Sequence, residues 1–236
     1  MWFKKKVDFC EEIYVKNDAE LMEATFWADK KNIRLFIPVD KLVMQGGFNY
    51  ANKHPFVDAL NYGRNTLEEF YRDVQPKDIA SFYNLSKQEL VGEDLPAWEI
   101  PWYFRSLRTA PRGEEGLDSS HGVSFYGPVS EKKINLEMSR LNSTLISIKK
   151  EGYNPNKYGD ISGYVMFFNG MSRFFVRGGK HRAAVLSYLG EKYIPVVFKE
   201  NFPRLIDVSK ADFWPLVLNN MMSKDLAIKI ASKYFD

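Results

Sequence analysis

The stretch RGGKHRAAVLSYLG, Arg177 to Gly190, places three basic side chains where an apolar helix pattern begins. Two glycines precede Lys180, His181 and Arg182, and an alanine-rich apolar run follows at once. This order predicts a glycine turn that leads into a helix, with Gly190 as its stop signal. The first turn of a helix carries unpaired N–H groups and a partial positive charge, so it favours acidic residues. Cations there are unfavourable unless an anion binds beside them, and we therefore expect an anion site at this turn.

The residue types in the turn suit a phosphate group. Gly178 and Gly179 allow the backbone to approach a ligand closely, and the helix start offers N–H donors. Lys180, His181 and Arg182 add charge and directed donors, and an arginine can grip phosphate at two points. A bare Gly-Gly-x-x-Arg pattern fits a simple turn with solvated cations equally well. The crowding of cations at this end of the helix favours the anion site.

The flanking sequence predicts a compact unit of helices and strands. A helix is indicated by apolar residues spaced by three and four, with Ser130 as its cap and Gly152 at its end. Asn169-Gly170 between two apolar runs predicts a hairpin, and the run Tyr193 to Phe198 predicts a strand. The apolar positions of the helix are Ile134, Met138, Leu141, Leu145 and Ile148.

The first half of the chain has a different pattern. Arg34 to Val43 resembles one strand, and short helices are expected at 54–63, 65–71 and 78–83. Leu95 to Gly122 is rich in proline, glycine and tryptophan, which predicts a long irregular connection. We expect an α+β (mixed α/β) protein in which residues 1–120 form a mostly helical N-terminal extension and 121–236 form the α/β domain.

Composition narrows the classes of function. The 236 residues carry a net charge of only +3, from 33 basic and 30 acidic residues, so nucleic acid is an unlikely partner of the chain as a whole. Cys10 is the single cysteine, and the three histidines form no metal signature. Because no apolar run is long enough to cross a bilayer, we expect no membrane insertion and a cytoplasmic protein. Nothing in the pattern predicts the oligomeric state.

The segment from Arg177 to Phe198, RGGKHRAAVLSYLGEKYIPVVF, resembles the core of the ParB/sulfiredoxin superfamily. Members of that superfamily carry a Gly-x-x-Arg element, an alanine-rich helix that ends at Leu-Gly, and an Ile-Pro-Val strand. SIKKEGY, Ser147 to Tyr153, is similar to the end of the helix that precedes the hairpin in that superfamily. The similarity covers about residues 126–199. The matching elements here are Gly179 to Arg182, Ala183-Ala184, Leu189-Gly190 and Ile194 to Val196.

The resemblance implies nucleotide handling, with ATP, ADP or CTP and Mg²⁺ as the expected cofactors. It implies a phosphate grip formed by Gly178, Gly179, Lys180, His181 and Arg182. Lys180 stands where sulfiredoxin has its reactive cysteine, which argues against sulfur chemistry. Only about 38 residues follow Phe198, which leaves little room for the helix-turn-helix of ParB proper.

A phosphotransferase also needs a group that orients or deprotonates its acceptor. Glu137 and Glu131 lie on the predicted helix and are candidate catalytic residues together with Lys180 and His181. A glutamate beside an apolar stripe is equally typical of a solvated helix flank. The candidate acceptor-site residues are Arg112, Glu114, His121 and Arg140, and a plain surface role is open for each of them.

These observations favour a nucleotide-dependent phosphotransferase that acts on a small hydroxyl acceptor. A sugar or polyol is suggested because the chain also resembles ParB-like proteins encoded among surface-polysaccharide genes. The alternatives are a non-catalytic CTP or ATP switch and a ParB-like module associated with nucleic acid.

Overall fold

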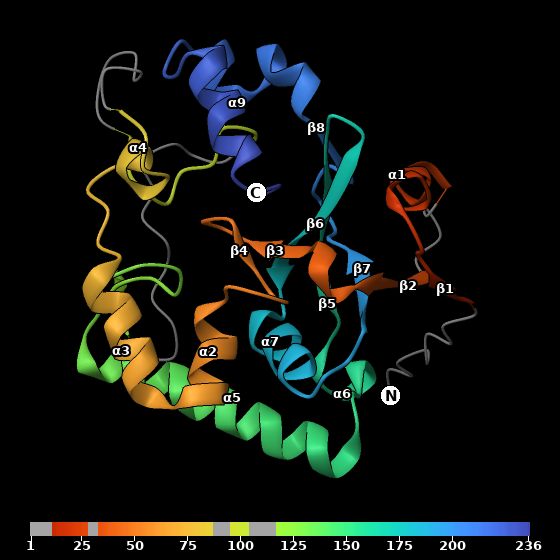
Figure 1. Cartoon of the computed structure of the whole chain (residues 1–236), viewed down its shortest axis with the longest axis vertical. Helices are drawn as coiled ribbons and strands as arrows, with labels where there is room; N and C mark the ends of the chain where they lie inside the picture. The colour runs from red at the N-terminus through yellow and green to blue at the C-terminus, as the bar shows by residue number, and fades with distance from the viewer. Residues whose placement is uncertain (1–10, 28–32, 87–94, 104–116) are drawn as a thin grey trace, which may run out of the picture.

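In the computed structural model, residues 11–27, 33–86, 95–103 and 117–236 are described, and their strands form one mixed sheet (Figure 1). The sheet order is β1-β2-β7-β5-β6-β3-β4, and β8 pairs with β5. The strands are β1 (Glu11–Tyr14), β2 (Ile33–Pro38), β3 (Leu42–Met44), β4 (Phe48–Asn49), β5 (Ile161–Phe168), β6 (Met171–Gly178), β7 (Tyr193–Phe198) and β8 (Leu205–Asp207). The mixed α/β class expected from the sequence is therefore observed.

The α-helices and 3₁₀ segments lie around this sheet. The α-helices are α1 (Asp18–Trp27), α2 (Pro55–Tyr62), α3 (Arg64–Asp73), α4 (Ile79–Phe82), α5 (Glu131–Glu151), α6 (Pro155–Tyr158), α7 (Lys180–Tyr188), α8 (Pro215–Leu218) and α9 (Lys224–Ser232). The 3₁₀ segments are η1 (Val39–Lys41), η3 (Ser119–His121) and η4 (Val208–Phe213). None of the helices in the described ranges has the length and apolarity to cross a bilayer.

The centre of the sheet is the hairpin of β5 and β6. Asn169 and Gly170 both have positive φ, 49° and 79°, as the tight turns of hairpins require, so this prediction is confirmed. β7 runs parallel to β5, and β3 runs parallel to β6. Strands β2 and β3, both from the first half of the chain, thus flank the three strands β7, β5 and β6.

The run Arg34 to Val43 is not one strand, as the sequence suggested. It is divided by η1 into β2, which pairs with β7, and β3, which pairs with β6. Pro38 ends β2 because proline has no N–H to give to a neighbouring strand. The two parts of the chain expected on either side of residue 120 therefore contribute strands to the same sheet. The first part contributes β1 to β4, where the sequence suggested a single strand.

The helix caps follow the sequence signals with one exception. Ser130 caps α5 and Gly152 ends it, as predicted, and His54 caps α2 by accepting the Phe56 N–H at 3.2 Å. The exception is α3, which begins at Arg64, one residue before the expected helix at 65–71. Gly63 occupies its cap position without a side-chain bond, because α3 follows α2 with no intervening loop.

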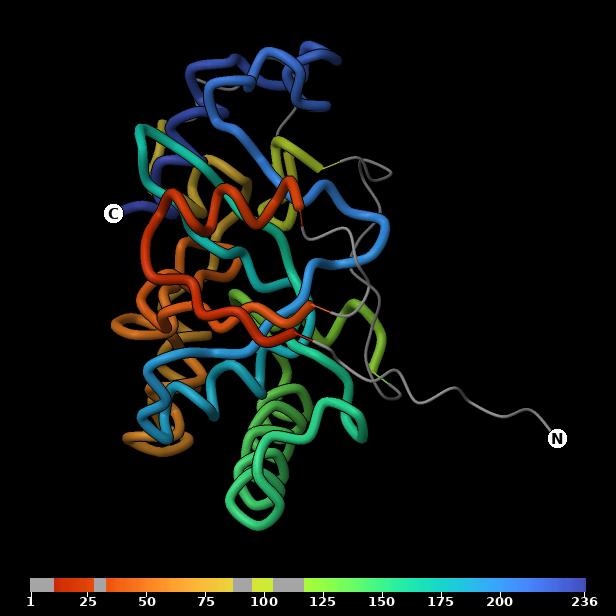
Figure 2. The backbone as a smooth tube through the Cα atoms, turned by 90° about the vertical axis from the view of Figure 1, so that its right-hand side faces the viewer, coloured from red at the N-terminus to blue at the C-terminus, as the bar shows by residue number. Residues whose placement is uncertain are grey.

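One end of the molecule brings α7, α5 and α2 together. α7 contacts β5 and β7 on one side and α5 and α2 on the other, in the lower part of Figure 1. The residues of α7 that face these neighbours, Ala183 to Leu186, are buried. The C-terminal segment with α8 and α9 lies at the opposite end, and Figure 2 shows the same separation from the side.

Candidate anion-binding site

The turn between β6 and α7 is formed by Gly179, which follows Gly178, the last residue of β6. Gly179 has a φ of +76°, and a Cβ there would lie 3.0 Å from Cα of Ile161 at the start of β5. A Cβ on Gly178 would lie 2.6 Å from Oγ of Ser162, beside a register shift in the β5–β6 pairing. The turn thus packs closely on β5, and side chains would force it away. This contact fixes where α7 begins.

The start of α7 has no side-chain cap. Gly179 is its N-cap residue and makes no capping bond, and the first intrahelical bond runs from the Ala183 N–H to the Gly179 carbonyl at 3.0 Å. The N–H groups of Lys180, His181 and Arg182 therefore have no partner inside the helix. Such a terminus is a ready-made place for an anion.

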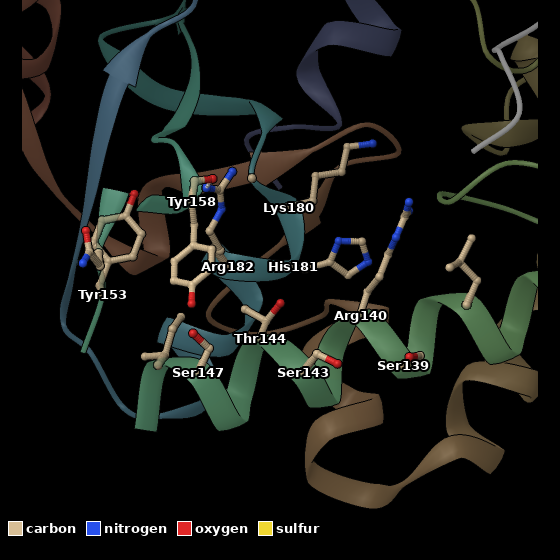
Figure 3. Close-up of a pocket in the computed structure, with 14 residues that line it drawn as sticks. Ser139, Arg140, Ser143, Thr144, Ser147, Tyr153, Tyr158, Lys180, His181 and Arg182 are labelled. Atoms are coloured by element: carbon tan, nitrogen blue, oxygen red, sulfur yellow. Dashed lines mark hydrogen bonds between the residues drawn. The ribbon is translucent and has the colours of Figure 1, made fainter. Parts of the chain in front are cut away.

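A cavity of about 650 Å³ opens beside this terminus, between α5, α6 and the start of α7 (Figure 3). Its basic side chains are Arg140, Lys180, His181 and Arg182, and no acidic residue of the described ranges lines it. The chain as a whole has nearly balanced charge, so this surface is selectively positive. The other lining residues are Leu136, Ser139, Ser143, Thr144, Ser147, Ile148, Tyr153, Asn154, Tyr158 and Gly179.

Lys180 lies at the edge of the cavity. Its Nζ is 5.2 Å from the centre of the Phe125 ring and 3.4 Å from Oγ of Ser124, a long and weak hydrogen bond. In Figure 3 its side chain extends away from α5.

The contacts of Arg182 differ from the phosphate contacts that the sequence predicts for it. Its Nη1 donates to the carbonyl oxygens of Tyr158 and Gly159, and its Nη2 lies 3.4 Å from the carbonyl oxygen of Asp160. The guanidinium group thus holds the segment from α6 to β5 while it lines the cavity. A phosphate could use the donors that remain, or it would have to displace these carbonyls.

His181 contacts a buried ion pair formed by Glu137 and Lys133. Its Nε2 lies 2.5 Å from Oε2 of Glu137, and Nζ of Lys133 lies 2.8 Å from Oε1 of the same carboxylate. The side chains of Glu137 and Lys133 are 0% and 3% exposed. Phe56 of α2 stacks on the imidazole, with 4.8 Å between the ring centres and 12° between the planes.

Burial by itself would raise the pKa of Glu137, but its two partners outweigh that effect. The hydrogen bond with His181 and the charges of His181 and Lys133 lower the pKa to about 2. Glu137 is therefore an ionised carboxylate. Both of its oxygens face protein partners, and it is not among the cavity residues.

His54 is buried close to the start of α7, where the charges of Lys180 and His181 act on it. It is 1% exposed, and its ring stacks on Tyr50 with 4.0 Å between the ring centres. Burial, and then the charges of Lys180 and His181, lower the pKa of His54 to about 3, so it is neutral at ordinary pH. Its Nε2 is buried and has no hydrogen-bond partner in the part of the chain that the structure describes.

The structure brings some of the predicted site residues together and separates others. Arg140 lines the cavity with Lys180, His181 and Arg182. Glu131 is 72% exposed and pairs with Arg64 of α3, away from the cavity. His121 lies at the cap of α5, with Nδ1 2.7 Å from Oγ of Ser130. Arg112 and Glu114 lie outside the described residues.

Several residues of the site did not stand out in the sequence. Lys133 was not singled out, although it stands four residues before the candidate Glu137, and the burial of this pair depends on the packing of α5 against α7 and α2. Phe56 and His54 come from a distant segment, and no local signal connects them with His181. The hydroxyl residues of α5 are equally typical of a solvated helix face.

The donor set at this site fits phosphate oxygens. A dedicated metal site is not evident, because the described residues contain no group of three or more His, Cys, Asp or Glu side chains that could hold an ion. No family model, curated protein or solved structure matches the chain. The ParB/sulfiredoxin resemblance therefore stays a prediction.

Proposed function

We propose that the protein is a nucleotide-dependent phosphotransferase with a small hydroxyl compound as acceptor. The observation that carries this proposal is the cavity lined by four basic and no acidic side chains at the uncapped start of α7. Helix N–H groups and fixed cations are the groups that stabilise a transferring phosphoryl group. We also propose that the unit belongs to the ParB/sulfiredoxin-like group, on the motif from Gly179 to Val196.

The nucleotide phosphates would bind the N–H groups of the first turn of α7 together with Lys180 and Arg140. ATP, ADP or CTP meets this chemistry equally, because each carries a terminal phosphate. Mg²⁺ would arrive with the nucleotide and neutralise phosphate charge, and we assign it no ligand from the protein. His181 and its buried partners, Glu137 and Lys133, are the residues that remain to act at the terminal phosphate.

The wall that α5 contributes to the cavity is lined by hydroxyl groups. Ser139, Ser143 and Thr144 lie on this wall (Figure 3). A hydroxyl can both donate and accept a hydrogen bond, which suits a ligand that itself carries several hydroxyls. This property supports a sugar or polyol as the acceptor, and the ribose of the nucleotide could use the same groups.

The test is turnover of nucleotide in the presence of acceptors. The protein is incubated with ATP, ADP or CTP, Mg²⁺ and a panel of sugars and polyols, and phosphorylated product is followed by mass spectrometry. Lys180→Gln should lower turnover, whereas Lys132→Gln, an exposed lysine of α5 outside the cavity, should leave it unchanged. Absence of turnover with every nucleotide and acceptor would overturn the proposal.

A second candidate is a nucleotide-gated switch that transfers no phosphate. Arg182 favours it, because this side chain both lines the cavity and holds the carbonyls of Tyr158 and Gly159. A bound phosphate would compete for the guanidinium and release that segment. Tight nucleotide binding without turnover, with faster amide exchange at 158–160, would support the switch.

A further inference from the structure

We propose that Lys133 and Glu137 are positioning residues that hold His181 in one tautomer, so that its Nδ1 takes the proton of the acceptor. The inference rests on the proposed function for the acceptor. The tautomer itself is a property of the protein alone and can be measured without any substrate.

The tautomer follows from the ionisation of Glu137. A carboxylate only accepts hydrogen bonds, and its Oε2 lies 2.5 Å from Nε2 of His181. Nε2 must therefore carry the hydrogen and donate it. A neutral imidazole has a single N–H, so the lone pair resides on Nδ1. Nδ1 has no hydrogen-bond partner in the described part of the chain, and His181 lines the cavity.

The carboxylate cannot turn away from His181. Its second oxygen is held at 2.8 Å by Lys133, and both side chains are almost fully buried. Phe56 covers one face of the imidazole and prevents the ring from tilting. Glu137 was a candidate catalytic base in the sequence. With both oxygens engaged, it acts through His181 instead.

The charges around His181 come from three elements. α5 presents Glu137, Lys133 and Arg140, α7 presents Lys180, and the cap of α2 presents the neutral His54. Glu137 supplies the negative charge of this group, and Lys133, Arg140 and Lys180 supply the positive charges.

The proposed step balances as a simple displacement. The acceptor hydroxyl oxygen forms a bond to the terminal phosphorus of the nucleotide, and its proton moves to Nδ1. The bond from that phosphorus to the bridging oxygen breaks, and the shortened nucleotide leaves with the electron pair. His181 then holds the proton as an imidazolium opposite the Glu137 carboxylate. No oxidant or further reactant is needed.

The first experiment is long-range ¹H–¹⁵N NMR on the imidazole rings of the unliganded protein, with His181→Asn used to assign the signals. The expected result, recorded at a pH at which the His181 ring is neutral, is an imidazole protonated at Nε2 and unprotonated at Nδ1. A ring protonated at Nδ1, or an equal mixture of tautomers, would overturn the inference.

The second experiment records the same signals in two variants. In Glu137→Gln the side-chain amide can donate as well as accept a hydrogen bond, so both tautomers of His181 should be present. In Lys133→Met the carboxylate is no longer held by its ion pair, so the preference for the Nε2-protonated tautomer should weaken. Glu131→Gln, an exposed glutamate of the same helix, is the matched control and should leave the tautomer unchanged. A single Nε2-protonated tautomer in Glu137→Gln would contradict the inference.

The rate of turnover separates the inference from the proposed function. Glu137→Gln and Lys133→Met should lower kcat and leave the KM for the nucleotide nearly unchanged, because neither residue lines the cavity. An unchanged kcat in both variants would overturn the proton-acceptor role and leave the phosphotransferase proposal intact. Absence of turnover would remove that proposal, whereas the tautomer result would still stand.

Discussion

α5 and α7 pack against each other, but their N-termini are built in opposite ways. α5 begins behind Ser130, whose Oγ accepts the Lys133 N–H at 3.2 Å, and its first residue is the acidic Glu131. α7 begins behind Gly179, which offers no cap, and its first three residues are basic. The first terminus has a side-chain cap and an acidic first residue, followed by Lys132 and Lys133, whereas the second has no side-chain cap and no acidic residue in its first turn.

The difference between the two termini indicates that the start of α7 is the place for a ligand. Both termini are formed by the same backbone physics, and only the start of α7 opens onto the positive cavity. Unfavourable local choices persist in proteins when they serve a ligand. Substitutions at the two termini should therefore separate stability from binding.

The largest effect is expected at the buried support of α7. Glu137→Ala removes a buried carboxylate that contacts both Lys133 and His181, which should lower the free energy of unfolding by about 3–5 kcal/mol. Glu131→Ala, on the exposed first turn of the same helix, should change it far less. Urea unfolding at pH 7 measures both. Similar losses for the two glutamates would mean that the buried network does not support α7 as described.

A second effect concerns pH. Because the pKa of His54 is about 3 in the folded protein and 6.5 in its reference state, its contribution to stability is complete above pH 6.5. That contribution declines as pH falls towards 3, with a slope of up to about 1.4 kcal/mol per pH unit. His54→Asn keeps a capping oxygen for α2 and should remove this slope. Unfolding by urea at pH 7, 6, 5 and 4 tests it, and an unchanged slope would contradict the account.

Gly179→Ala should destabilise the protein by about 1–2 kcal/mol, since its φ of +76° is strained for alanine. The new Cβ also meets Ile161 at 3.0 Å, so the turn must shift and phosphate binding should weaken. Gly152→Ala is the matched control at the end of α5. It has a φ of +71° but no atom within 4 Å of the new Cβ, so it should cost stability without affecting binding. Thermal unfolding and phosphate titration, performed on both variants, make the comparison.

Ser130→Ala should cost about 1 kcal/mol, the usual value of a lost helix cap, and leave phosphate binding unchanged. The result would show that the start of α5 serves stability alone. A clear loss of phosphate affinity in this variant, measured by calorimetry, would mean that the two helix starts are not independent.

The smallest stability effect is expected from Lys180→Gln. Removing a cation from the start of α7 should change the free energy of unfolding by less than about 0.5 kcal/mol. The affinity for phosphate or nucleotide should fall by about tenfold, because a charged donor is lost. Arg182→Ala is a less specific test, because that side chain also holds the carbonyls of Tyr158 and Gly159. Unchanged affinity in Lys180→Gln would contradict the anion site.

Much of the local structure could be predicted from the sequence. The hairpin at Asn169-Gly170, the boundaries of α5 and the start of α7 depend on turn residues, caps and apolar spacing, which act over a few positions. The division of Arg34 to Val43 into two strands was not predicted, although Pro38 is a local signal for it. The partners of the two strands could not be predicted, because they depend on which distant strands are available, and β2 and β3 have different ones.

The candidate site shows the same limit. That cations and glycines meet at a helix start can be predicted from adjacent residues and backbone geometry. The contacts of each side chain at this start depend on the folded structure. It directed Glu137 to His181, Arg182 to the carbonyls of the α6–β5 segment, and Glu131 to the surface. The reason is that burial and charge pairing are set by segments distant in sequence, such as α2 and α5, which packing brings to α7.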